Sequence, residues 1–156
     1  MSPEDFMRRA IALSAEAINS NSGGPFGAVI VCDGKIVGEG INRVTSTNDP
    51  TAHAEVTAIR DACTKLGRFS LAGCEIYTSC EPCPMCLAAI YWARLDRMHY
   101  GNSQDDAAAI GFDDAFLYGE VALPIDGRSL KTTRLLAADA NTVFKAWADK
   151  PDKIAY

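Results

Sequence analysis

Two short segments, about thirty residues apart, constrain the fold of this chain more than any other feature. They are residues 51–55 (TAHAE) and residues 80–86 (CEPCPMC). A helix-forming stretch begins within each segment: residues 52–66 in the first case and 84–93 in the second. The sequence therefore predicts two helices that carry histidine, cysteine and glutamate side chains at their first turns.

The spacing of three of these side chains predicts a metal site. Cys83 and Cys86 are three residues apart, so on a first helical turn their sulfurs lie on one face and can share one ion. His53 supplies a third ligand. Two thiolates and one imidazole around zinc leave a fourth tetrahedral position for water, as in catalytic sites, whereas structural sites fill all four. Helix N-termini also favour the thiolate forms of both cysteines.

Glu55 has the position of a proton carrier. It follows His53 by two residues, so on a helix the two side chains diverge and do not form a ligand pair. Zinc lowers the pKa of bound water from about 15.7 toward 7, and a neighbouring carboxylate can pass protons to a substrate nitrogen and to a leaving amine. Together these groups predict hydrolysis at an amidine-like carbon.

Each motif alone is a weak signal. A lone C-x-x-C also fits a redox dithiol or half of a structural zinc site, and H-x-E is frequent by chance. The combination of H-x-E with a later P-C-x-x-C is the signature of zinc-dependent nucleobase deaminases. The alternative from another class is a zinc-stabilised interaction module, in which the free coordination position and Glu55 would be accidental.

The remaining sequence predicts one layered α/β domain spanning residues 1–156. Asp33-Gly34 between two apolar runs predicts a β-hairpin. A helix from Pro3 ends before Gly23, and short helical pieces are predicted near Asp105 and Asp114. The other predicted elements are strands 26–32, 35–41, 75–78 and 97–100 and a helix at 141–150.

Charge and cysteine usage limit the partners and the compartment. A net charge of −5 disfavours binding to a phosphate backbone, so we expect small substrates, no nucleic acid and no membrane. The acidic opening of the sequence, residues 1–5, is unlike an export signal, which predicts a cytoplasmic protein. The six cysteines are then expected to be thiols or ligands and not disulfides, with Cys32, Cys63 and Cys74 as plain thiols. His99 is expected to be a strand residue with no chemical role, and Cys80 is left open.

Five segments resemble the cytidine deaminase-like superfamily and, within it, the bacterial guanine deaminases. They are residues 24–31, 48–56, 77–86, 90–94 and 111–114. The resemblance extends along nearly the whole chain and implies a three-layer α/β/α fold with a five-stranded mixed sheet. It also implies one zinc ion per chain, held by His53, Cys83 and Cys86, with Glu55 as proton shuttle.

The resemblance also implies the substrate contacts. Phe26 would pack on a purine ring, Asn42 would hydrogen-bond the base, and Asp114 would assist departure of ammonia. Trp92 and Phe112 would line the pocket. Without the resemblance, Asn42 is an ordinary strand-end residue and Asp114 an ordinary helix cap.

The implied reaction is conversion of guanine to xanthine and ammonia in purine metabolism. Guanosine, cytosine and aminated triazines remain open as substrates, as does adenosine in tRNA, against which the acidic charge argues. The resemblance further implies a homodimer that exchanges a C-terminal tail, residues 151–156, so that Tyr156 acts on the partner's site. Composition alone predicts a frayed tail.

Overall fold

The computed structural model describes residues 1–156. In chain order the elements are α1 (Pro3–Asn19), β1 (Gly27–Cys32), β2 (Lys35–Ile41), α2 (Val44–Thr47), α3 (Ala54–Leu66), β3 (Cys74–Cys80), α4 (Pro84–Trp92), β4 (Arg97–Asn102), α5 (Gln104–Ala109), α6 (Asp114–Ala122), the 3-10 turn η1 (Ile125–Gly127) and α7 (Ala137–Asp149). Every helix and strand that the local sequence pattern predicts is present. The short helix α2 and the turn η1 were not predicted, and α7 begins four residues before the predicted start.

Local chemistry sets the ends of several elements. Ser2 and Asp5 form a capping box at the start of α1, with Pro3 as the first helical residue. Asp33 and Gly34 both have positive φ, 49° and 71°, as the two central residues of a type I′ hairpin turn require. The left-handed conformation of Gly67, with φ of 62°, ends α3.

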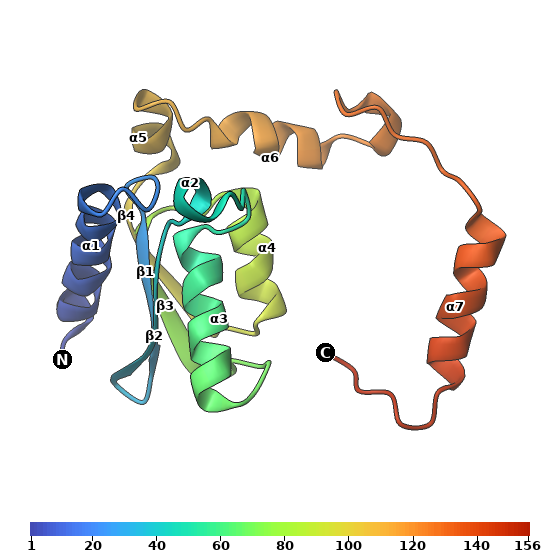
Figure 1. Ribbon diagram of the computed structural model, residues 1–156, viewed down its shortest axis with the longest axis horizontal. Helices are drawn as coiled ribbons and strands as arrows, with labels where there is room; N and C mark the ends of the chain where they lie inside the picture. Colours follow the sequence, from blue (N-terminus) through green and yellow to red (C-terminus); the bar gives the residue numbers. More distant parts are fainter.

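The four strands form one mixed sheet in the order β2-β1-β3-β4. Strand β1 runs antiparallel to β2 and to β3, whereas β3 and β4 are parallel. Helix α1 covers one face of the sheet, and α3 and α4 cover the other (Figure 1). The three-layer α/β/α arrangement is as predicted.

The predicted five-stranded sheet is wrong by one strand. Directly after β4, the Ser103 hydroxyl accepts a hydrogen bond from the backbone N–H of Asp106, and the Asp106 carboxylate accepts one from the backbone N–H of Ser103. This second capping box starts α5 where the chain would otherwise continue toward a fifth strand. From Ser103 onward the chain forms only helices, turns and irregular segments.

Small residues let α3 approach the sheet closely and so place its N-terminus. A Cβ atom on Gly40 would lie 2.2 Å from the carbonyl oxygen of Ala54, and one on Gly38 would lie 2.7 Å from that of Ala58. The alanines of α3 pack with Ile30 and Ile76 in the core on this side of the sheet. The first turn of α3, which carries the first motif, is therefore fixed against the sheet.

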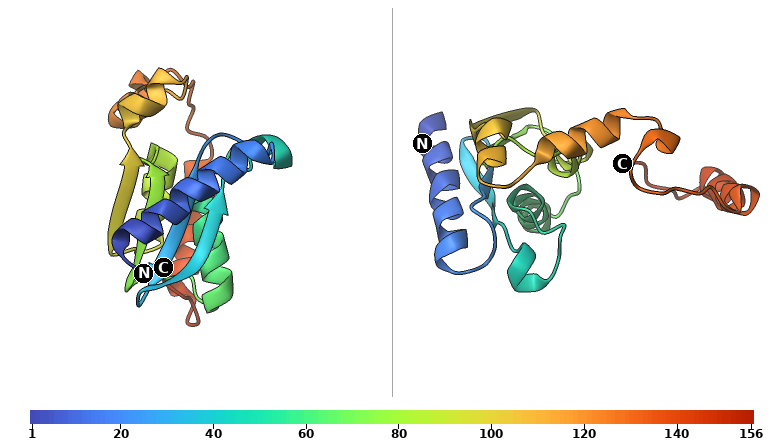
Figure 2. Two further views of the ribbon diagram at one scale, coloured as in Figure 1. Left: turned by 90° about the vertical axis from the view of Figure 1, so that its left-hand side faces the viewer. Right: turned by 90° about the horizontal axis from the view of Figure 1, so that it is seen from above.

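The C-terminal third of the chain extends away from these layers as an arm (Figures 1 and 2). We define the arm as residues 114–156, which contain α6, η1 and α7. None of its side chains is buried within the chain. Large apolar side chains are exposed along it, including Leu130, Leu135, Leu136, Val143, Phe144, Trp147, Ile154 and Tyr156. No helix of the protein has the length and apolar character needed to cross a membrane.

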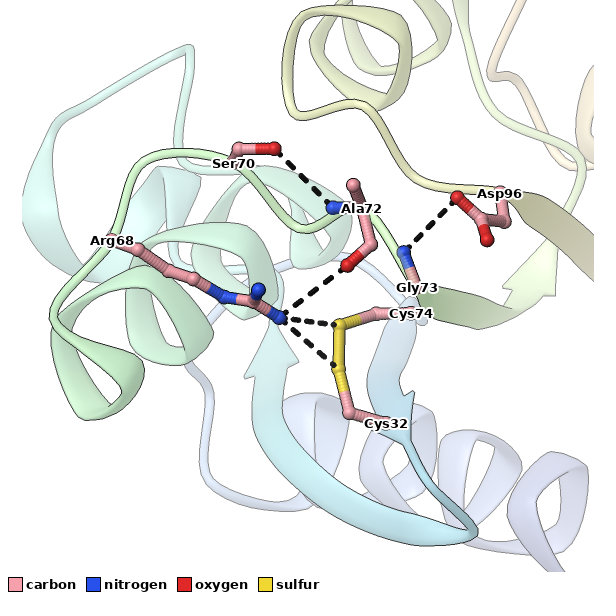
Figure 3. The surroundings of a disulfide bond; sticks show 7 residues. All are labelled: Cys32, Arg68, Ser70, Ala72, Gly73, Cys74 and Asp96. Carbon is pink, nitrogen blue, oxygen red and sulfur yellow. Dashed lines mark hydrogen bonds between the residues drawn. A yellow bond between two sulfur atoms is a disulfide. The ribbon is translucent and has the colours of Figure 1, made fainter.

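Two of the expected plain thiols are instead joined. Cys32 and Cys74 face each other at the last pair of the β1–β3 ladder and form a disulfide (Figure 3). Their Cα atoms are 4.4 Å apart, within the range that a disulfide spans. The Arg68 guanidinium lies against both sulfurs. The expectation of thiols at these two positions is therefore wrong, because strand register brings together residues 42 positions apart in the sequence.

Candidate active site

Two helix N-termini on the same side of the sheet bring three potential metal ligands together. His53 is the N-cap residue of α3, Cys83 is the N-cap residue of α4, and Cys86 lies in the first turn of α4. The ligand atoms of all three lie within 4.8 Å of one another. The sequence-based prediction of a shared site at the start of two helices matches this geometry.

The spacing of the ligand atoms fits zinc. The Nδ1 atom of His53 lies 3.6 Å from the Cys83 sulfur and 3.4 Å from the Cys86 sulfur. Zinc bonds of about 2.0–2.1 Å to nitrogen and about 2.3 Å to sulfur, at tetrahedral angles, place such atoms roughly 3.6 Å apart. One zinc ion would therefore fit between them, held by these three side chains.

The ionisation of the three groups is also suited to a cation. The hydrogen bond from Cys86, together with His53, lowers the pKa of the Cys83 thiol to about 4. The hydrogen bond with Cys83 raises the pKa of His53. Without a metal these groups therefore share protons among themselves, and a bound cation replaces those protons.

Glu55 lies beside the cluster and is not part of it. Its side chain is 6% exposed, and the Thr78 hydroxyl lies 3.4 Å from its Oε1 atom. Burial raises the pKa of the carboxyl above its ordinary value, which suits a group that accepts and returns a proton near neutral pH. Glu55 thus places an ionisable carboxyl at the wall of the cavity, beside the three potential metal ligands.

A cavity of about 260 Å³ opens onto the site. Seven residues that the sequence singled out line it: Phe26, Asn42, His53, Glu55, Cys83, Phe112 and Asp114. Cys86 is fully buried behind it. The volume lies just below the range of about 300–1,000 Å³ that is usual for ligand pockets, so the cavity suits a small ring.

Two aromatic rings form one wall of the cavity. Phe26 and Phe112 pack edge to face with their centroids 4.9 Å apart. A Cβ atom on Gly24 would lie 3.0–3.2 Å from both rings, so a larger residue at this position would crowd the two phenylalanine side chains. This wall offers a π-face to a flat heterocycle.

The orientation of the Asn42 amide is fixed by the backbone around it. Its Oδ1 atom accepts hydrogen bonds from the backbone N–H groups of Gly24 (3.2 Å) and Val44 (3.1 Å). Both acceptor positions are thereby used, and the Nδ2 amino group has no partner within the chain. Asn42 is only 5% exposed and lines the cavity, so it presents hydrogen-bond donors there.

Asp114 begins α6 but is not its cap. The preceding residue, Asp113, accepts the capping hydrogen bond from the backbone N–H of Phe116. Asp114 instead lines the cavity, where burial and the nearby Cys83 sulfur raise the pKa of its carboxyl. Asp114 therefore adds a carboxylate from α6 to the cavity that Glu55 of α3 also lines.

Several cavity residues were missed by the sequence reasoning. Val44 and Thr45 come from α2, a four-residue helix without a capping signal, so nothing in the sequence marked them. Glu81 and Pro50 also line the cavity; Glu81 lies inside the recognised segment 80–86, and Pro50 directly precedes the segment 51–55.

Trp92 and Tyr156 lie elsewhere in this chain. Trp92 ends α4, is 62% exposed and does not line the cavity. Tyr156 packs near Trp92 and Phe69, with ring centroids 5.9 and 6.5 Å apart. The tail of a chain therefore does not reach that chain's own cavity, and the predicted contact of Tyr156 with a substrate requires a second subunit.

Comparisons with known proteins agree with this chemistry. The family model of the cytidine and deoxycytidylate deaminase zinc-binding region matches residues 1–102. The guanine deaminase of Bacillus subtilis is 51% identical over 100% of both chains, and its X-ray structure has a TM-score of 0.97, covering 100% of this chain and 99% of that one. The tRNA-specific adenosine deaminase of Agrobacterium fabrum is 41% identical over 67% of this chain and 68% of its own.

More distant structures share the core. That of a guanine deaminase from Nitrosomonas europaea has a TM-score of 0.68 at 34% identity, covering 72% of this chain and 65% of that one. A structure solved in complex with 2,6-diaminopurine has the same TM-score and identity, covering 72% and 63%. The chain belongs to the zinc-dependent cytidine and deoxycytidylate deaminase family, in the group that contains the guanine deaminase of Bacillus subtilis.

Proposed function

We propose that this protein hydrolyses guanine to xanthine and ammonia. The observation that carries the proposal is the length of the match to guanine deaminase, which runs through the arm and includes Asp114. The tRNA-specific adenosine deaminases of Agrobacterium fabrum and Haemophilus influenzae match only 67% and 71% of the chain. The arm is thus a feature shared with the guanine-acting relative.

The residues of the cavity have separate roles in this reaction. Zinc held by His53, Cys83 and Cys86 would supply an activated water molecule at neutral pH. Glu55 is placed to carry two protons in turn: one from the attacking water to a ring nitrogen of guanine, and a second from the hydroxyl group added to the same ring carbon to the amine, which leaves as ammonia. Asp114, which also lines the cavity, assists the departure of ammonia.

Asn42 and Phe26 orient the base. Because Asn42 can only donate into the cavity, it matches acceptors on the purine, which in guanine include the carbonyl oxygen and unprotonated ring nitrogens. Phe26 packs on the ring, with Phe112 at its edge. The complex of a related structure with 2,6-diaminopurine supports a purine in this position.

The competing substrates are separated by one assay. Purified, zinc-loaded protein is incubated with guanine, guanosine, adenine, cytosine, an aminated triazine and a tRNA anticodon stem-loop containing adenosine, and ammonia release is measured. We expect guanine to be the preferred substrate, with little release from adenine, whose amine is on a different ring carbon. Preferred release from adenine or from the stem-loop would contradict the proposal, and release from none would favour the zinc-stabilised module.

We further propose that the functional unit is a homodimer that exchanges its C-terminal tails, residues 151–156. The apolar side chains of α7 stay exposed within the chain, and Tyr156 of the tail meets only the exposed rings of Trp92 and Phe69. An exposed apolar surface of this extent indicates a protein interface. Tyr156 then covers the partner's cavity and excludes water from it. In such a dimer residues 1–156 act as one domain. We also propose a cytoplasmic location, for which the Cys32–Cys74 disulfide is an exception to the thiols usual in that compartment.

Removal of the last four residues, 153–156, tests the exchange. The truncated protein should stay folded and zinc-loaded, since all four residues are exposed, but its turnover of guanine should fall sharply. Mixing it with a full-length Glu55→Gln variant under conditions that reassort subunits should restore activity. In the heterodimer, the cavity with intact Glu55 receives its tail from the variant partner.

Normal turnover by the truncated protein alone would mean that the tail has no role in catalysis. Absence of restored activity in verified heterodimers would mean that the tail does not act across subunits. The full-length Glu55→Gln homodimer is the matched control and should be inactive.

A further inference from the structure

Tyr118 connects α6 to the metal site. Its hydroxyl donates a 2.7 Å hydrogen bond to the carbonyl oxygen of Pro82, the residue directly before the ligand Cys83. Tyr118 follows Asp114 by four residues, so both side chains lie on the same face of the helix. Both are partly buried, whereas the neighbouring Phe116 and Leu117 are exposed.

Little else holds α6 in place within the chain. None of its residues is buried, so apolar packing does not determine where the helix lies against the core. The hydroxyl of Tyr118 therefore supplies a specific, directional contact one turn away from Asp114. Loss of this contact leaves the helix free to shift relative to the metal ligands.

A second hydrogen bond anchors the start of α5, the helix that precedes α6. The Oε2 atom of Glu81 accepts a 2.8 Å hydrogen bond from the backbone N–H of Gln104, the first residue of α5. The backbone N–H of Glu81 donates to the carbonyl oxygen of Asn102. Glu81 and Pro82, the two residues directly before the ligand Cys83, are thus hydrogen-bonded to α5 and to α6, the helix that begins with Asp114.

We propose that Tyr118 is a positioning residue that fixes the Asp114 carboxylate relative to the zinc ligands, with the Glu81–Gln104 hydrogen bond as a second anchor. The inference rests on the proposed role of Asp114 in the deamination. A displacement of about 1 Å of a reacting group can reduce a rate about a hundredfold, so the effect appears in turnover and not in substrate affinity.

The test is a double-mutant cycle of Tyr118→Phe and Asp114→Asn, measured on the substrate that the wild-type protein deaminates fastest. Tyr118→Phe removes the hydroxyl and keeps the ring. We expect kcat to fall about ten- to hundredfold, with KM changed by less than about threefold. The double variant should be no slower than Asp114→Asn alone, because Tyr118 acts through Asp114.

Three further measurements separate positioning from a general structural role. Zinc content and dimer content of Tyr118→Phe should equal those of the wild type, and hydrogen exchange should increase in α6 and not in α3 or α4. Tyr100→Phe, at an exposed tyrosine of β4, is the matched control and should have wild-type kinetics. Failure of the wild type on guanine would refute the proposed function but leaves this cycle measurable on its preferred substrate.

Wild-type turnover by Tyr118→Phe, additive losses in the double variant, or loss of zinc without a shift in α6 would each overturn the proposal. If Tyr118→Phe does not fold, Gln104→Pro replaces it in the cycle. Proline is tolerated at the first position of a helix and lacks the backbone N–H that donates to Glu81. This variant therefore removes the Glu81–Gln104 hydrogen bond and leaves the Tyr118–Pro82 bond in place. Its kcat should then fall in the same non-additive way, and an unchanged kcat would overturn the proposal.

Discussion

The Glu55→Gln variant is expected to keep its zinc and its fold and to lose nearly all turnover. Glutamine has the same shape and can still meet the Thr78 hydroxyl, but it cannot accept and return a proton. Transfer by a positioned acid-base group contributes about 10²–10⁴-fold to a rate, and kcat should fall by that factor. The measurements are kcat on guanine, zinc by elemental analysis, and the thermal midpoint.

Glu16→Gln is a matched control at an exposed site on α1 and should leave kcat unchanged. Loss of zinc from Glu55→Gln would make Glu55 a ligand and contradict its separation from the three converging groups. Retained turnover would assign the proton transfers to another residue.

The Cys83→Ala and His53→Ala variants are expected to lose both zinc and activity. Each removes one of only three protein ligands, and two remaining ligands hold the ion too weakly to survive purification. Zinc should fall from about one per chain in the wild type to near zero. Cys63→Ala, which removes a free cysteine outside the cluster, should keep full occupancy. Full occupancy in both ligand variants would mean that the metal is held elsewhere.

The metal site could be predicted because its information is local. The i, i+3 spacing of Cys83 and Cys86 and the two-residue step from His53 to Glu55 fix which side chains share a helix face. Helix starts carry their own signals in the preceding residues. Two local patterns were then sufficient, because both helices begin on the same side of the sheet.

Features that depend on register or on distant packing could not be predicted in this way. The Cys32–Cys74 disulfide follows from the pairing of β1 with β3, and no local pattern encodes that pairing. The fifth strand came from family resemblance, whereas in this chain the capping box at Ser103 starts a helix. The lining role of Trp92 was an inference from resemblance, and in the single chain this residue lies outside the cavity.

Asp114 and Asn42 were both marked by the sequence, but the direction of each side chain was not. Asp114 looked like a helix cap from sequence alone, but the neighbouring Asp113 has that role and leaves Asp114 free to face the cavity. The fixed orientation of Asn42 depends on backbone N–H groups from Gly24, before β1, and from Val44, the first residue of α2, which no spacing rule describes. The sequence thus marked which residues belong to the site, and the structure shows which way their side chains face.

The central claim is that zinc held by His53, Cys83 and Cys86 enables this chain to deaminate guanine. Its most direct test is the ultraviolet spectrum of guanine during incubation with zinc-loaded protein, with protein stripped by a chelator, and with stripped protein given one equivalent of zinc. We predict stoichiometric conversion to xanthine and ammonia by the loaded protein, none by the stripped protein, and recovery on addition of zinc. Conversion that is unaffected by stripping, or no conversion at full zinc occupancy, would contradict the account.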